Sequence, residues 1–225
     1  MHGTCNTVTK INLDSFKTSF PAKLLAGVQK GVMRTQYRSV PLYKSPFDLV
    51  LYLQLISRLR PATVIEIGAK FGGSALWFAD MLALHGISPR IVSVDIEDLP
   101  RPSDSRILFI HGDVLSLGVA LPNELLKELP RPWLVVEDSA HYYHTCLAAL
   151  TFFDACLEKG DYLVVEDGIV AELPQNIYGR YENGPNRAVN DFLSAHPERY
   201  KIDWELCDFY GRNITYNPNA WLCRT

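Results

Sequence analysis

Two short segments of this 225-residue chain have the same sequence, and each ends in a pair of carboxylates. The pentapeptide LVVED occurs at 134–138 and again at 163–167, 29 residues later. Each copy is typical of a short apolar strand that ends in two acids, and this separation is the length of one βαβ unit. If the two strands are neighbours, their ends lie about 5 Å apart.

Acids at that spacing raise one another's pKa, so they need a compensating charge. A divalent cation supplies it, and all-oxygen ligation favours Mg²⁺, Mn²⁺ or Ca²⁺ over zinc. Successive strand residues face opposite sides, so we expect Asp138, nearer the mouth of the site, to be a ligand rather than Glu137. The alternative is that these acids cap the following helices or stay solvated.

A glycine-rich segment, EIGAKFGGS at 66–74, follows another apolar run. Glycines let the backbone turn tightly and approach a ligand. The spacing differs from the dinucleotide pattern G-x-G-x-x-G, and no Lys-Ser or Lys-Thr follows the last glycine as in a Walker loop. A ligand without a pyrophosphate fits better, and Glu66 would suit a cationic amine.

Two further acids follow the next apolar runs. Asp95 stands 27 residues after Gly68, where an acid can accept both hydroxyls of a ribose. Asp113 could receive an adenine amino group, although Gly-Asp is a common turn pair. An amine, a ribose and no phosphate describe S-adenosylmethionine (AdoMet). The alternative is a glycine turn that only packs a helix on a strand.

Two histidines follow the first acidic pair. His141 and His144 are three apart at an expected helix start, so they would share one side of it. One of them, with His141 nearer to Asp138, could be a general base near neutral pH. A rival interpretation joins Asp138, His141 and His144 as a two-histidine, one-carboxylate iron site. Histidines at helix starts also serve as capping or surface residues.

The elements that must position these residues alternate along the chain. Short apolar runs between helical patterns predict a parallel sheet with helices on both faces. The expected strands are 63–68, 91–96, 106–113, 132–138 and 161–167, and the expected helices are 46–60, 74–86, about 119–129, 141–158 and 185–195. Residues 204–210 and 214–225 are expected to form an antiparallel pair at the sheet edge, and a polar loop spans 171–184.

Composition narrows the class of protein. Apolar residues make up 48% and charged residues 21%, which indicates one globular domain with a sizeable core. With 22 basic and 25 acidic residues, the chain has no general electrostatic affinity for nucleic acid or an anionic membrane. Its five scattered cysteines form no C-x-x-C pair, and we find neither a signal-peptide core nor a membrane span. We therefore expect a cytoplasmic protein.

Several motifs, in order, resemble class I AdoMet-dependent methyltransferases. They are E-x-G-x-x-x-G-G-S from Glu66, the second-strand Asp95, D-x-x-H from Asp138 and V-E-D-G from Val165. Within that class, the chain is similar to the cephalosporin-hydroxylase-like group, which is related to metal-dependent sugar and macrolide O-methyltransferases. The similarity covers residues 35–224 and includes VPLYKSPFDL at 40–49.

The resemblance implies a Rossmann-like α/β fold, with a doubly wound, mostly parallel, seven-stranded sheet and one antiparallel strand near the C-terminus. It divides the chain into an N-terminal arm or lid, 1–45, and an AdoMet-binding domain, 46–225. Carried over by motif, Glu66, Gly68, Gly72, Ser74, Asp95 and Asp113 would hold AdoMet, and Asp138, Glu166 and Asp167 would hold Mg²⁺. His141 or Asp138 would accept the proton.

The expected activity is methyl transfer to a hydroxyl of a small molecule, either a secondary metabolite or a sugar-like acceptor. Mg²⁺ would lower the pKa of that hydroxyl, and loop 171–184 and the arm would line the acceptor cavity. Leu24, Leu25 and Val28 suggest a short amphipathic helix in the arm that packs on a partner subunit in a homo-oligomer. The alternative is that the first 30 or so residues form a poorly ordered tail. The alternatives are an iron hydroxylase and a non-catalytic subunit that binds AdoMet or substrate for a partner enzyme.

Overall fold

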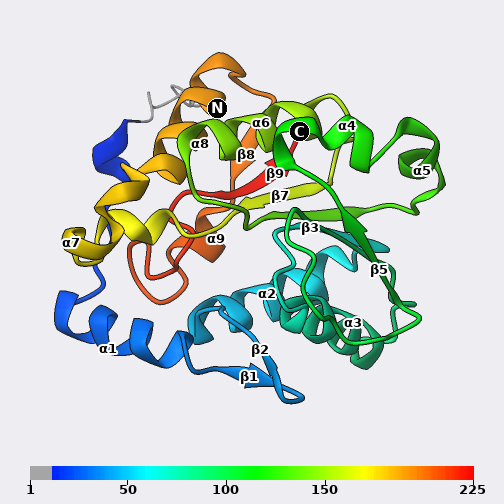
Figure 1. Ribbon diagram of the computed structural model, residues 1–225. Coiled ribbons are helices and arrows are strands. Elements are labelled where there is room, and N and C mark those ends of the chain that lie inside the picture. Colours follow the sequence, from blue (N-terminus) through cyan, green and yellow to red (C-terminus); the bar gives the residue numbers. More distant parts are fainter. Residues whose placement is uncertain (1–11) are drawn as a thin grey trace.

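The computed structural model describes residues 12–225, and within them seven strands form one sheet with helices on both faces (Figure 1). The strand order is β5-β4-β3-β6-β7-β9-β8. Their bounds are β3 Thr63–Ile67, β4 Ile91–Asp95, β5 Ile107–His111, β6 Trp133–Glu137, β7 Tyr162–Val165, β8 Tyr200–Ile202 and β9 Trp221–Arg224.

The direction of the strands confirms the predicted topology. Strands β3 to β7 are parallel, and the two LVVED strands are neighbours, with Leu134 opposite Tyr162. β9 alone among the seven strands runs antiparallel, pairing with both β7 and β8. The carboxyl ends of the parallel strands therefore share one edge, where a crevice forms in doubly wound sheets.

Side chains of each strand alternate between two cores. Ile65 and Val135 face the layer of α6 and α8, whereas Val64 and Leu134 face α2 and α3. Figure 1 shows these layers above and below the sheet. The helices are α2 Pro46–Leu59, α3 Gly73–Leu84, α4 Leu117–Ala120, α5 Asn123–Glu128, α6 Tyr143–Asp154, α7 Gln175–Tyr178, α8 Gly184–Ala195 and α9 Trp204–Cys207.

Three expected elements differ from those observed. Residues 204–210 do not form a strand, because the Asp203 side chain accepts from Leu206 N and starts α9 instead. The strand that pairs with β9 is β8, four residues earlier. The helix expected near 119–129 is divided between α4 and α5, because Pro122 cannot continue α4. The closing strand is confined to β9, since 214–220 form a loop.

The N-terminal segment packs beside loop 171–184. It contains α1 Ala22–Val32 and a short hairpin of β1 Gln36–Tyr37 and β2 Val40–Pro41. Leu25 and Val32 of α1 share a small core with Ile169, Leu173 and Tyr216. Among residues 12–225, no helix combines the length and the apolar character needed to cross a membrane. The division at residue 45 remains a prediction, and residues 1–11 lie outside the described part of the chain.

Candidate active site

Two cavities meet at the carboxyl edge of the sheet. The first, of about 370 Å³, lies over the ends of β3 and β4 and includes Gly68, Asp95 and Asp113; we call it the β4-side cavity. The second, of about 400 Å³, includes residues of α1 and loop 171–184; we call it the arm-side cavity. Gly68, Lys70, Asp138 and Ser139 border both. Both volumes are within the range of small-molecule sites.

Gly68 borders both cavities, at a position where only glycine fits. Its φ is +105°, and a Cβ at this position would lie 1.9 Å from the backbone oxygen of Asp138. Gly72, with φ +78°, directly precedes α3 as its N-cap, and a Cβ there would meet the ring of Phe109 at 2.8 Å. Ser74, in the first turn of α3, borders the arm-side cavity.

The predicted ribose and adenine acids do line the β4-side cavity. The Asp95 carboxylate accepts from the backbone N–H groups of Lys70, at 2.5 Å, and Glu97, at 2.7 Å. Asp113 accepts from Leu115 N at 2.9 Å. Both acids therefore also shape the loops that form the cavity wall.

Glu66 borders neither cavity. Its side chain is buried on the α2 side of β3, where it accepts from Ser93 Oγ at 2.6 Å. Strand alternation explains this position, since Ile65 and Ile67 face the other side. The structure thus brings five of the six predicted AdoMet residues to the crevice or to the turn that forms it, and places Glu66 beneath them.

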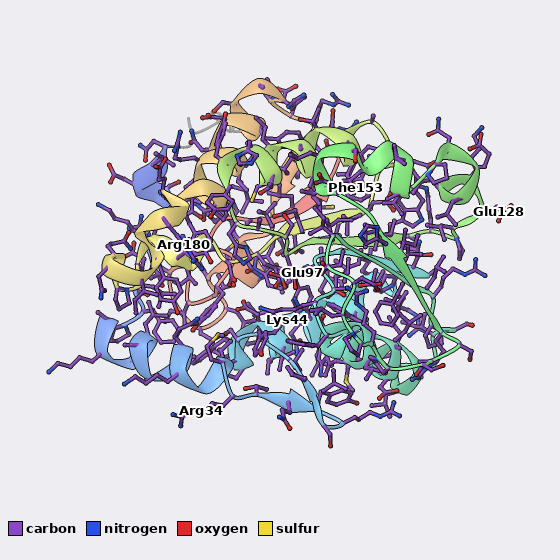
Figure 2. The ribbon with its side chains drawn as sticks, in the orientation of Figure 1. Arg34, Lys44, Glu97, Glu128, Phe153 and Arg180 are labelled. Atoms are coloured by element: carbon purple, nitrogen blue, oxygen red, sulfur yellow. The ribbon has the colours of Figure 1, made fainter. Side chains whose placement is uncertain are left out.

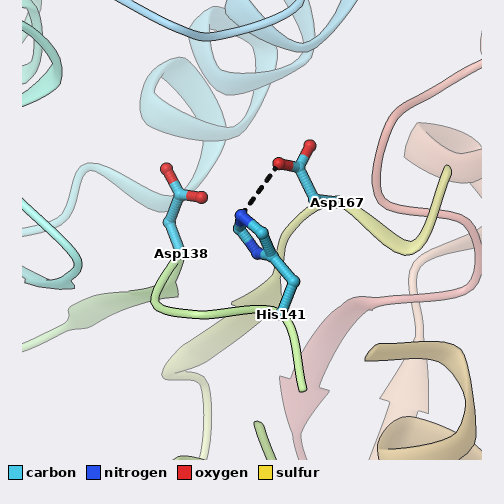
Figure 3. Close-up of side chains that lie close together, drawn as sticks. All are labelled: Asp138, His141 and Asp167. Atoms are coloured by element: carbon cyan, nitrogen blue, oxygen red, sulfur yellow. Dashed lines mark ion pairs between the residues drawn. The ribbon is translucent and has the colours of Figure 1, made fainter. Parts of the chain in front are cut away.

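Asp138, His141 and Asp167 form a compact group at the border of the arm-side cavity. Each offers a ligand atom within 4.8 Å of the others. Nε2 of His141 lies 3.3 Å from Oδ2 of Asp167. The dashed line in Figure 3 marks this pair. His141 and Asp167 both have left-handed backbones, with φ of +59° and +60°. Such conformations are strained in residues other than glycine, and they cluster at functional sites.

Glu166 lies outside this group, although it was predicted as a metal ligand with Asp138 and Asp167. Its buried carboxylate accepts from Lys44 Nζ at 2.6 Å and from the hydroxyl of Tyr52. Val165 and Asp167 flank it in a strand end where successive side chains alternate. The structure therefore assigns Glu166 to an internal ion pair, and His141 takes its place beside the two aspartates.

His144 does not join Asp138 and His141. It is exposed and stacks on Tyr142, with ring centroids 5.8 Å apart. The expected i, i+3 relationship fails because α6 begins only at Tyr143, so His141 precedes the helix. The rival two-histidine iron set is therefore not assembled.

Lys44 is the residue of this site that sequence reasoning missed. It is 3% exposed, and Nζ lies 3.0 Å from Oδ2 of Asp138 as well as 2.6 Å from Glu166. In Figure 2 Lys44 lies near the middle of the view, while Arg34 of the same arm lies at its lower edge. Burial opposes the charge of Lys44, but the two carboxylates outweigh it and raise its pKa. A lone lysine before a helix is ordinarily solvated, so its sequence context gave no signal.

Comparison with known proteins places the chain in a family. The model for "Rhamnosyl O-methyltransferase/CmcI" matches residues 29–225. The chain belongs to this family. Rhamnosyl O-methyltransferase of Mycobacterium bovis (strain BCG / Pasteur 1173P2) is 30% identical over 196 residues, which cover 85% of this chain and 78% of that protein. The Mycobacterium leprae (strain TN) protein of the same name is 32% identical over 194 residues, covering 84% and 83%.

A solved member shares the fold. The Mg-SAM structure of cmcI-D160 superimposes with a TM-score of 0.67 at 23% identity, covering 86% of this chain and 77% of that one. The match to the rhamnosyl O-methyltransferase/CmcI family therefore confirms the resemblance seen in the motifs. The shared fold confirms the predicted sheet.

Proposed function

We propose that the chain is an AdoMet- and Mg²⁺-dependent O-methyltransferase that acts on a hydroxyl of a small, sugar-like acceptor. One observation carries this proposal: Asp138, His141 and Asp167 converge at the arm-side cavity, and Asp138 also borders the β4-side cavity. A cofactor and an acceptor in these cavities would meet at that group. Family relatives named rhamnosyl O-methyltransferase support the reaction class and the sugar acceptor.

The acids that line the β4-side cavity lie where they could bind AdoMet. Asp95 stands at the end of β4, where doubly wound folds hold a ribose, and Asp113 borders the same space. Gly68 borders the same space, and its missing Cβ lets the backbone of Asp138 pack against it. When bound, AdoMet supplies a methyl group on a positively charged sulfonium. The acids of this cavity would orient the nucleoside and stabilise the positive charge of the sulfonium.

The three carboxylates at the ends of β6 and β7 have a charge that suits a divalent cation. Asp138, Glu166 and Asp167 carry three negative charges if ionised, and Lys44 compensates only one of them. Asp138 and Asp167 would hold Mg²⁺, while Glu166 stays with Lys44 behind them. When bound, Mg²⁺ acts as a Lewis acid toward a hydroxyl oxygen.

His141 is the proton acceptor in this proposal. If Nε2–H donates to Asp167 Oδ2, 3.3 Å away, the carboxylate orients the ring and leaves the lone pair on Nδ1. Nδ1 has no hydrogen-bond partner among the described residues. Asp138 is the other acid-base candidate, but it is held by Lys44 at 3.0 Å. His141 can therefore take a proton from an acceptor hydroxyl without losing an existing bond.

The first experiment measures methyl transfer from labelled AdoMet to a panel of sugars and phenols. We expect turnover that stops with EDTA and returns with Mg²⁺, and that falls at least about 100-fold in Asp167→Asn. Calorimetry should show weaker AdoMet binding in Asp95→Ala than in Asp98→Asn, a control on the same loop. Activity that survives both EDTA and Asp167→Asn would remove the metal from the proposal. Oxygen consumption with bound iron would favour the hydroxylase instead.

We also propose a cytoplasmic homo-oligomer that acts in secondary metabolism. Cys146, Cys156, Cys207 and Cys223 are all free thiols, which suits a reducing compartment. Exposed Leu24 and Met33 at the arm offer apolar surface for a second subunit. Sedimentation velocity on the full chain would test the assembly, and a monomer at all concentrations would contradict it.

A further inference from the structure

Three buried polar atoms around the arm-side cavity lack a hydrogen-bond partner within residues 12–225. They are the Tyr216 hydroxyl, Nδ1 of His141 and Oε1 of Gln29. Folded proteins pair nearly all of their buried polar atoms. Three of the nine unpaired ones within the described residues belong to residues that line this one cavity, which points to a polar ligand there. They come from three separate segments: the C-terminal loop, the turn before α6, and α1.

Tyr216 is held firmly in this wall. Its backbone N–H donates to Oδ2 of Asp48 at 2.9 Å, and its carbonyl accepts from Ile169 N at 3.0 Å. The side chain is 4% exposed. Burial, and after it the carboxylate of Asp167, raises the pKa of Tyr216. The phenol therefore stays protonated and keeps a hydrogen available for a ligand.

Gln29 approaches the cavity from α1. Its Nε2 donates to the hydroxyl of Tyr178 at 3.0 Å, which connects the arm to loop 171–184. The other end of the amide remains free to accept from a ligand. Gln29 therefore contributes one acceptor, and the Tyr216 hydroxyl contributes one donor.

Aromatic rings form part of the remaining wall, beside the charged side chains of Lys70 and Arg180. Tyr43 packs edge-on against Phe71 at 6.3 Å, and Tyr181 packs edge-on against His141 at 5.5 Å. Apolar walls with a few fixed polar groups are typical of sites that orient a small molecule. A saturated ring with apolar faces and several hydroxyls matches both features.

We infer that Tyr216 and Gln29 determine acceptor specificity by binding hydroxyls of the acceptor other than the one that is methylated. The inference rests on the proposed function and extends it to these two residues. A site built to bond a particular hydroxyl discriminates strongly against the analogue that lacks it, because its own polar group then stays unpaired.

The test compares wild type with Tyr216→Phe, which keeps the ring and removes only the hydroxyl. Calorimetry with S-adenosylhomocysteine present measures the affinity for methyl α-L-rhamnopyranoside and for each of its monodeoxy analogues. We expect wild type to bind one monodeoxy analogue about tenfold more weakly than the parent glycoside. Tyr216→Phe should bind the parent as weakly as it binds that analogue. Tyr200→Phe on β8 removes a hydroxyl that donates to Asp154 of α6, away from the cavity, and should behave as wild type.

Gln29→Met gives an independent measurement on a different element, and it should lose discrimination at another hydroxyl. If Tyr216→Phe and Gln29→Met both discriminate as wild type does, the inference is overturned. Saturable binding of catechol with none of the sugars also overturns it, even where methyl transfer to catechol upholds the proposed O-methyltransferase. The expected sugar-binding pattern without any methyl transfer would instead uphold the specificity residues and contradict the proposed reaction.

Discussion

Lys44 and Glu166 form a buried ion pair, with Nζ 2.6 Å from Oε2, although 122 residues separate them in the chain. Nζ also contacts Asp138, so one ammonium neutralises part of the acidic group. Removing one member of such a pair leaves a buried charge uncompensated, which commonly costs 3–5 kcal/mol. Lys44→Met should therefore lower the free energy of unfolding by roughly that amount.

Urea denaturation would measure this effect, with Lys70→Met as a control for losing an exposed lysine at the same cavities. The double variant Lys44→Met/Glu166→Gln should recover part of the lost stability, because the unpaired carboxylate is then removed. A single variant as stable as wild type, or a double variant whose losses simply add, would mean that the pair is not coupled.

Gly68→Ala should disrupt the crevice between the two cavities. The new methyl group would lie 1.9 Å from the backbone oxygen of Asp138, and φ of +105° strains any other residue. We expect a loss of about 3 kcal/mol or more in unfolding free energy, together with loss of AdoMet binding. Gly27→Ala is the matched control, since it adds a methyl group in open space within α1 and should stabilise that helix by about 0.5–1 kcal/mol.

Asn217 positions Asp167 by accepting from its backbone N–H at 3.2 Å. Because Asp167 has φ of +60°, this bond helps to hold a strained conformation. Asn217→Ala should weaken Mg²⁺ affinity by about 10- to 100-fold, as loss of a residue that orients a metal ligand often does. Calorimetric titration with Mg²⁺ alone would measure it against Asn123→Ala, an exposed asparagine on α5. Equal affinities in both variants would show that Asp167 needs no such support.

Asp104 should make stability sensitive to acid. Hydrogen bonds from Arg106 lower the pKa of Asp104 to about 2, below its ordinary value of about 3.9. A depressed pKa means that the folded state holds fewer protons, so this stabilisation is present above about pH 4 and is lost as pH falls toward about 2. The contribution should be under about 1 kcal/mol, since solvent screens the pair. The stability difference between wild type and Asp104→Asn should therefore shrink from pH 6 to pH 3; a constant difference would contradict this.

The sequence by itself determined the sheet and most of the strand-end residues. Alternation of short apolar runs with helices predicts parallel strands, and parallel strands place their carboxyl ends at one edge. Asp95 at the end of β4 and Asp138 after β6 were therefore expected at the same edge of the sheet. Gly68 was identifiable for the same local reason, since a tight turn after a strand requires glycine.

Only the tertiary structure decided which side chains complete the site. The partner of Glu166 is Lys44, whose position depends on how the arm packs 122 residues away, and no local pattern encodes that distance. His141 rather than His144 joins the aspartates because its backbone adopts φ of +59° before α6 begins. Tyr216 reaches the arm-side cavity because buried Asp48 holds its backbone. These choices depend on long-range packing and on backbone angles, whereas the strand pattern depends on neighbours in sequence.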